Sequence, residues 1–230
     1  MPATIVGIQL GQIRTEGDSQ TKHSMNRRWT TAFYKFPVTA PLYIHSLGVF
    51  GDEIADKRYH GGADKAVLAY SRDNYPKWQA ELIANDFADP SGYLATFGPG
   101  AFAENLTIAG QDENDVCLGD QYQIGDDESA SVILEVSQPR QPCWKISRRW
   151  QHKTLTKRVA ATGRTGWYFR VIRDGQVDRG QAVTLLHRPH PNWTISRAND
   201  VLLGRETDRY AAMELLALEV LAADWKASLS

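Results

Sequence analysis

The feature that most constrains the fold is a long succession of short apolar, β-branched segments separated by turns rich in glycine, proline and aspartate. Breaks such as "FGPG", "IGDDES" and "RDGQ" are typical connections between strands. Strands at this spacing favour a β-barrel or a β-sandwich. We predict eight strands, over residues 5–12, 42–45, 67–70, 105–108, 121–124, 132–137, 166–172 and 182–187.

Helical periodicity appears at three places. One helix follows Asp73, a capping residue type, and carries its apolar stripe on Tyr75, Trp78, Leu82 and Ile83. Another covers residues 154–162 and ends at Gly163. From residue 195 to 229 the chain is rich in Ala and Leu at helical spacing, which predicts three short helices packed as a bundle. We therefore predict a mostly β domain over residues 1–190 and a helical extension over 191–230.

Composition narrows the class of protein. No apolar run of the 230 residues reaches transmembrane length, and the N-terminus lacks the basic region of a signal peptide, so we expect a cytoplasmic protein with no membrane partner. The two cysteines, Cys117 and Cys143, are too few for a four-cysteine zinc or iron–sulfur site. A disulfide between them is not expected in a reducing compartment.

The net charge of −1 conceals a strong asymmetry. Residues 136–173 hold ten Lys/Arg and no acid, whereas residues 112–128 hold seven acids and no base. Such runs are most often solvated faces. A one-sided basic run that surrounds a rigidly held cysteine instead predicts an anionic ligand, either nucleic acid or a phosphorylated cofactor.

That cysteine is Cys143, in "QPRQPCWKI" over residues 138–146. The prolines predict a rigid extended bend and no helix. The thiolate is the metal-binding form of cysteine, and neighbouring cations such as Arg140 and Lys145 stabilise negative charge. A lone cysteine is commonly a small buried hydrophobe, but this segment has no periodicity that would bury it. We assign that structural role to Cys117.

Two further stretches carry polar groups suited to a ligand. His60-Gly61-Gly62 places consecutive backbone amides beside a histidine, a geometry that binds anions, although an ordinary Gly-Gly turn explains it equally well. Glu104-Asn105 enters a predicted strand in "GAFAENLTI". Asn105 can pair with the edge of a heterocycle, but a polar pair at a strand start is usually structural.

Taken in order, the motifs resemble those of the MOSC domain, named after the C-terminal part of molybdenum cofactor sulfurases. The resemblance runs from the N-terminus to about His187 through "GDEIADKRYHGGADKAVLAY", "FAENLTI", "VCLGDQYQIG", "LEVSQPRQPCWKI" and "GRTGWYFRVI". The tail resembles the three-helix extension of the YiiM-type branch. The resemblance implies a MOSC-type β-barrel with a few helices, followed by a small α-helical bundle.

The resemblance also implies a ligand, the molybdenum cofactor, in which a phosphorylated pyranopterin (molybdopterin) holds the metal. Cys143 would donate its thiolate to molybdenum. Arg140 and Lys145 would contact the phosphate or the pterin, and His60, Gly61 and Gly62 would line the cofactor. Asn105 would form a hydrogen bond to the pterin. Pyridoxal phosphate is not expected.

The implied activity is an oxidoreductase that reduces N-hydroxylated compounds, such as N-hydroxylated purine bases, to amines, which would detoxify N-hydroxylaminopurine. Because the chain has neither iron–sulfur cysteines nor a dinucleotide-binding motif, electrons would come from a separate flavin or iron–sulfur reductase. The C-terminal helices would either cover the barrel or dock the electron donor or a second subunit of a homodimer.

Other functions fit some of the same residues. Cys143 suits a sulfur carrier that holds a persulfide, or a protein that carries the molybdenum cofactor without using it. A basic barrel can bind single-stranded nucleic acid through Trp144, Trp150, Trp167 or Tyr168. A thiol hydrolase with His60 as base is the weakest alternative, because no helix N-terminus is predicted beside Cys143.

Overall fold

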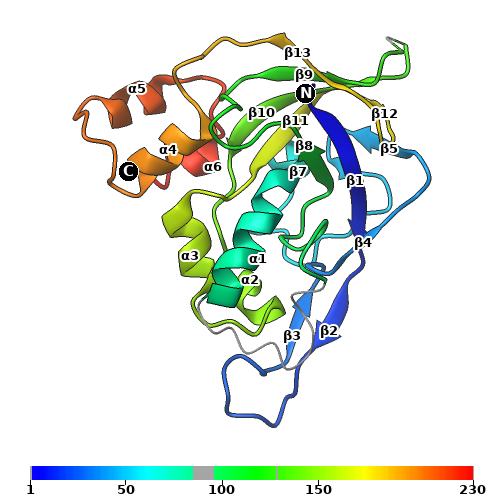
Figure 1. The fold of residues 1–230 in the computed structure, drawn as a ribbon, viewed down its shortest axis with the longest axis vertical. Helices are drawn as coiled ribbons and strands as arrows, with labels where there is room; N and C mark the ends of the chain where they lie inside the picture. The colour runs from blue at the N-terminus through cyan, green and yellow to red at the C-terminus, as the bar shows by residue number, and fades with distance from the viewer. Residues whose placement is uncertain (1, 85–95, 128, 230) are drawn as a thin grey trace.

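The computed structural model describes residues 2–84, 96–127 and 129–229. Its centre is an eight-stranded sheet in the order β13-β9-β10-β11-β7-β8-β1-β4 (Figure 1). The strands are β1 (Thr4–Gly11), β4 (Lys35–Pro37), β7 (Val67–Ser71), β8 (Leu106–Ala109), β9 (Gln121–Ile124), β10 (Val132–Pro139), β11 (Trp167–Arg173) and β13 (Val183–His187). Neighbours run antiparallel except β7 and β8, which are parallel.

The sheet closes on itself. Thr4 bridges Ala182, and the amide of Val183 donates to the carbonyl of Ala3 at 2.9 Å, so the start of β1 meets the start of β13. Closure removes the exposed sheet edges between these strands. The predicted barrel is confirmed, and all eight predicted strands are present with ends shifted by one or two residues.

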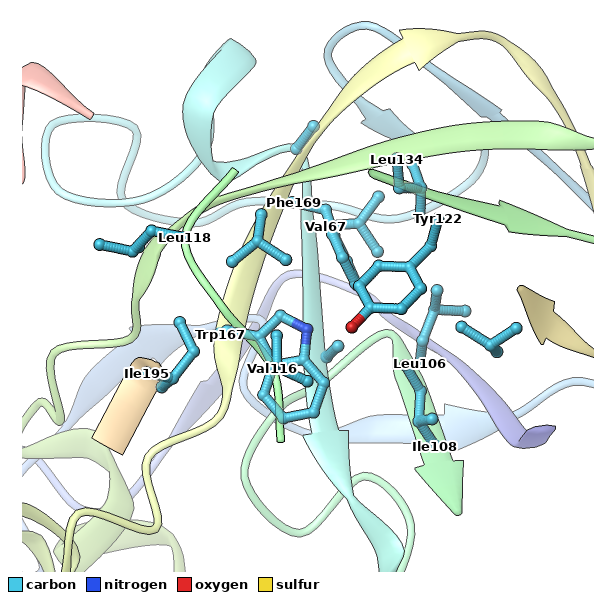
Figure 2. Packing of buried hydrophobic residues seen from close by; sticks show 14 of the residues in the cluster. Val67, Leu106, Ile108, Val116, Leu118, Tyr122, Leu134, Trp167, Phe169 and Ile195 are labelled. Atoms are coloured by element: carbon cyan, nitrogen blue, oxygen red, sulfur yellow. The ribbon is translucent and has the colours of Figure 1, made fainter. Parts of the chain in front are cut away.

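Alternation along the strands fills the interior. Figure 2 shows Val67, Leu106, Tyr122, Leu134 and Phe169, which come from five strands and meet in one cluster. Each is at most 2% exposed. Burying a side chain of this size contributes about 1.5–3 kcal/mol, so this cluster is the main source of the barrel's stability.

Within the described residues, five short strands were not predicted from the sequence. Two of them, β2 (Arg14–Glu16) and β3 (Trp29–Thr31), form a ribbon, and a third is β4, described above. The other two, β6 (Gly48–Val49) and β12 (Gly175–Val177), flank the predicted strand β5 (Leu42–His45) in a small sheet. Strands of two or three residues are too short to show a period of two.

A second, aromatic-rich core lies below the barrel, where α1 (Tyr75–Ala84), α2 (Lys145–Arg149) and α3 (Leu155–Thr162) pack together. α3 ends at Gly163 in the left-handed conformation, as predicted. Two expectations for α1 are wrong. Ser71, not Asp73, caps the preceding turn η2 (Arg72–Asn74), because its hydroxyl accepts from the Asp73 amide, and Ile83 is 65% exposed.

The prediction of no helix in "QPRQPCWKI" is also wrong at its end, since α2 begins at Lys145. Pro142 lies ahead of the first turn, where it does not interrupt the helix. The extended bend is confined to residues 140–143.

The tail forms the three predicted helices, α4 (Ile195–Leu202), α5 (Ala211–Ala217) and α6 (Ala223–Lys226). Ile195, Leu215 and Trp225 belong to the same buried cluster as the barrel residues, so the helices cover the barrel. A short turn, η1 (Ala63–Lys65), precedes β7. Within the described ranges, no helix combines the length and apolar character needed to cross a membrane.

Candidate functional site

A cleft enclosing about 630 Å³, counted to its open mouth, lies where β10 leads into α2. Its other walls come from the loop over residues 52–61 and from residues 31–35 around β3. Cys143, His60, Gly61, Asn105, Arg140 and Lys145 all line this cleft, although they come from three separate stretches of sequence. These stretches are residues 60–61, residue 105 and residues 140–145, so the fold brings together six of the seven residues selected from the sequence. Gly62 is exposed and does not line the cleft.

The Cys143 thiol is free and partly exposed. Its backbone is fixed on the side away from β10, because its carbonyl accepts from the Thr156 hydroxyl at 3.0 Å and from the Ile146 amide at 3.1 Å. Thr156 lies on α3, so two helices hold the position of the thiol. Besides the prolines, one backbone and one side-chain hydrogen bond hold this segment, and sequence alone shows neither.

Arg140 and Lys145 are buried cations, 4% and 7% exposed. The Arg140 amide donates to the carbonyl of Gly166 at 3.0 Å, but its buried Nη1 has no hydrogen-bond partner. Among the described residues, no carboxylate lies within ion-pair distance of either side chain. A buried guanidinium without a partner is costly, so the pair is suited to an anion.

Other cations of the same basic run are neutralised within the protein. Arg164 pairs with Glu81 at 2.5 Å, and Arg170 pairs with Asp64 and Glu135 at 2.9 and 2.8 Å. The run is therefore not one continuous basic face. Arg140 and Lys145, which lie beside Cys143, are among the cations of the run without an ion pair in the described part of the chain.

Burial and the positive charges of Lys145 and Arg140 affect the pKa of His60. Its pKa is lowered to about 4, first by burial and then by the charges of Lys145 and Arg140, with Asp56 opposing. The imidazole is therefore neutral at pH 7. Gly61 and Gly62 both have positive φ, 81° and 85°, as expected for a glycine turn next to the histidine.

Asn105 holds the cleft wall together. Its side-chain oxygen accepts from the Leu68 amide at 3.3 Å, and its side-chain nitrogen donates to Asp52 at 2.9 Å. Asp52 also forms a buried ion pair with Lys35, whose pKa is lowered by burial, an effect opposed by Asp52. Asn105 lines the cleft while these bonds engage both ends of its amide, and its contact with a pterin stays a prediction.

The sequence analysis missed four residues of this region. Lys35 and Asp52 lie 17 positions apart, and only the closed barrel brings them together. Tyr168 lines the cleft from β11, and burial raises its pKa. Lys65 lines the cleft and pairs with Asp224 of α6 at 3.0 Å. The "GWYFR" stretch gave a usable signal for Tyr168, which follows a buried strand residue, but nothing local distinguishes the others.

Cys117 has the structural role predicted for it. It is 1% exposed, and burial raises its pKa. Its amide donates to Asp120 at 2.8 Å, in a buried cluster that includes Arg188.

The order of the motifs along the chain can now be compared with known families. The model of the MOSC domain matches residues 56–184, which contain the thiol, the two cations and the glycine turn. The chain belongs to the MOSC family. Residues 193–230 match the YiiM-like, 3-alpha helix domain, which corresponds to α4, α5 and α6. The predicted resemblance to both is thereby confirmed.

Individual members of the family are similar to this protein over most of its length. It is 35% identical over 204 residues to a protein named "Reductase" from Gibberella moniliformis. That alignment covers 89% of this chain but only a third of the longer relative. It is 33% identical over 212 residues to the uncharacterized protein YflK of Bacillus subtilis, and this alignment covers 92% of this chain and 89% of YflK. The crystal structure of YiiM from Geobacillus stearothermophilus superposes with a TM-score of 0.75 at 29% identity, and covers 99% of this chain and 97% of YiiM.

Proposed function

We propose that the protein is a molybdenum cofactor-dependent reductase that converts N-hydroxylated compounds, such as N-hydroxylated purine bases, to amines. The observation that carries the proposal is the cleft in which the Cys143 thiol lies with two buried cations that have no carboxylate partner. The similarity to the Gibberella protein named "Reductase" supports the same class of reaction.

The residues of the cleft fit this cofactor. A soft thiolate suits molybdenum, and the unpartnered Nη1 of Arg140 together with Lys145 suits the phosphate of a pterin. Cys143 would be the metal ligand, and Arg140 and Lys145 would bind the anionic end. His60 and Gly61 would line the bound group, and Asn105 would form a hydrogen bond to the pterin; Gly62, which does not line the cleft, has no role in this proposal. When bound, the cofactor supplies the two-electron chemistry that removes the hydroxyl oxygen.

The chain's own residues would set the electrostatics and the water content of the site. Because Arg140 and Lys145 are buried, their charges act with little solvent screening. Neutral His60 adds no further charge near pH 7. Lys35 lies on the cleft wall and donates from Nζ to the Asp52 carboxylate. Reduction of an N–OH group to an amine consumes two electrons and two protons and releases one water.

Reduced methyl viologen, an artificial donor, tests the activity without a partner protein. Cofactor-loaded protein should reduce an N-hydroxylated purine with viologen as donor and should not turn over with NADPH alone. Turnover with NADPH by the purified chain would refute the need for a separate reductase. Absence of viologen-driven turnover by protein that contains molybdenum would refute the reductase itself.

A sulfur carrier is the second candidate, because Cys143 is partly exposed and able to hold a persulfide. Persulfide detected by mass spectrometry on protein without metal would favour it. The other two alternatives lose support. Trp150, Trp167 and Tyr168 are buried and cannot stack on bases, and only Trp144 is exposed. Although α2 does provide a helix start near Cys143, His60 with a pKa of about 4 is a poor general base for a thiol hydrolase.

A further inference from the structure

A cluster of arginine and tryptophan side chains, exposed at Arg27, Arg28 and Trp144 and buried at Trp29, lies beside the mouth of the cleft. We call it the arginine–tryptophan rim, and it consists of Arg27, Arg28, Trp29, Trp144 and Arg148. Trp144 directly follows Cys143, is 53% exposed, and lines the outer hollow that continues from the cleft. A large apolar ring at the surface next to the reactive thiol is a feature that barrel stability does not explain.

The rim is held together by contacts between Trp29 and residues 144–148, which are far apart in the sequence. The rings of Trp29 and Trp144 lie 5.3 Å apart, and the Arg148 guanidinium lies over both, 5.5 and 4.8 Å from their centres. Arg148 donates to the carbonyl of Ser24, which ties α2 to the turn between β2 and β3. Figure 1 shows this ribbon extending beside α2 at the lower end of the molecule.

The charge of the rim is not balanced locally. Among the described residues, no carboxylate lies within ion-pair distance of Arg27, Arg28 or Arg148. The pKa of Arg148 is lowered, first by burial and then by the nearby charge of Arg27. Asp18 lies opposite Arg27 in the ribbon but forms no ion pair with it. Like charges gathered at one surface without ion pairs are favoured when an acidic partner or solvent ions neutralise them.

We propose that the arginine–tryptophan rim docks the acidic face of the electron-transfer protein that reduces the site. Arginine and tryptophan are the residue types that contribute most to protein–protein affinity, and complementary charge speeds association. Docking here brings the donor against Trp144, one residue from the proposed metal ligand. The inference rests on the proposed function: the donor is oxidised by two electrons for each N–O bond that is broken, and the oxygen leaves as water with two protons.

The experiment compares two donors on cofactor-loaded protein. One is an acidic electron-transfer protein, tested as a flavodoxin and as a [2Fe–2S] ferredoxin, each kept reduced by its NADPH reductase. The other is reduced methyl viologen, which needs no docking surface. The variant is R27E/R28E, because both side chains are exposed. The matched control is R179E/R209E, which makes the same charge change at exposed positions. Arg179 lies between β12 and β13 and Arg209 between α4 and α5, elements that Figure 1 draws away from the ribbon.

In R27E/R28E we expect the KM for the donor protein to rise by about tenfold or more and its dependence on salt to weaken. Viologen-driven turnover should equal that of the parent, and R179E/R209E should match the parent with both donors. Substitution of Trp144 by Ala should lower protein-driven turnover without changing the salt dependence, which distinguishes contact from charge steering.

An unchanged donor KM in R27E/R28E would overturn the inference. So would the absence of turnover with both acidic proteins when viologen supports it. Binding of a labelled single-stranded oligonucleotide that R27E/R28E abolishes, with protein-driven turnover unchanged, would assign the rim to nucleic acid and would also overturn it. Loss of viologen-driven turnover in the parent refutes the proposed function itself, so the two failures are distinguishable.

Discussion

Replacement of Arg140 by Met should change the stability of the protein and its affinity for anions in opposite directions. Met keeps most of the apolar stem and removes the guanidinium, which is 4% exposed and whose Nη1 has no partner. In the free protein that charge is buried beside Lys145 without a carboxylate. We therefore expect R140M to stabilise the free protein and to weaken anion binding.

The magnitude follows from the contacts. An unsatisfied buried polar group costs about 1–3 kcal/mol, so its removal should add a similar free energy of unfolding. For a chain of this size each kcal/mol raises Tm by about 2–4 °C, which gives a gain of about 2–12 °C. A hydrogen bond to a charged group contributes about 1.5–3 kcal/mol, so the Kd for an anion should rise by about tenfold to a hundredfold.

The assay is thermal unfolding and calorimetric titration with inorganic pyrophosphate, both on cofactor-free protein. R164M is the matched control, since Arg164 belongs to the same basic run but pairs with Glu81 and lies over the Trp78 ring, 3.9 Å from its centre. R164M should lower Tm and leave pyrophosphate affinity unchanged. A lower Tm for R140M together with parent affinity for pyrophosphate would show that Arg140 is a structural cation and would refute the reasoning.

Three further predictions concern the cleft and its support. The pKa of His60 is about 4 in the folded protein against an ordinary 6.5, so the unfolded chain binds the proton first as pH falls. At most about 3 kcal/mol of stability is therefore lost between pH 6.5 and 4. In H60Q the plot of Tm against pH should be flatter over this range. G166A should destabilise strongly, because a Cβ there lies 2.4 Å from a β7 carbonyl oxygen, whereas G180A, at a similar positive φ in open space, should cost about 1–2 kcal/mol by chemical denaturation. W225A should cost about 3–5 kcal/mol, since this α6 side chain lies in the barrel core, while M213A at a position 68% exposed should change the free energy of unfolding by less than about 0.5 kcal/mol. If W225A also behaved as a surface substitution, the tail would be independent of the barrel.

The buried cations show how stability and function compete in this fold. Arg140 and Lys145 lie where a hydrophobic pair would stabilise the free protein more, and their field lowers the pKa of His60. Buried charges that have no partner within the protein often mark a functional site. Here the uncompensated charges lie in the same cleft as the thiol.

Seven of the eight strands of the sheet could be predicted, because apolar and β-branched residues recur along them between turns, whereas β4 is too short to show such a pattern. Val132, Leu134 and Val136, for example, alternate inward on β10. The end of "QPRQPCWKI" could not, because Trp144 and Lys145 follow a proline whose effect on the backbone ends ahead of the helix.

For the cleft, the sequence supplied the residues of the strongest motifs but not their support. Cys143, Arg140 and Lys145 lie within six positions, so their proximity follows from the chain itself. The ion pair of Lys35 with Asp52, and the hydrogen bond from Thr156 that fixes Cys143, depend on tertiary packing. Neither leaves a periodic or local signal.

The measurement that tests the account most directly is the molybdenum and pterin content of protein made in a host that produces the cofactor. C143S is compared with the parent, and C117S serves as the control at the buried cysteine. We expect near-stoichiometric molybdenum and oxidised-pterin fluorescence in the parent and in C117S, and loss of metal in C143S. Metal content that is independent of Cys143, or the absence of both metal and pterin from the parent, would contradict the central claim.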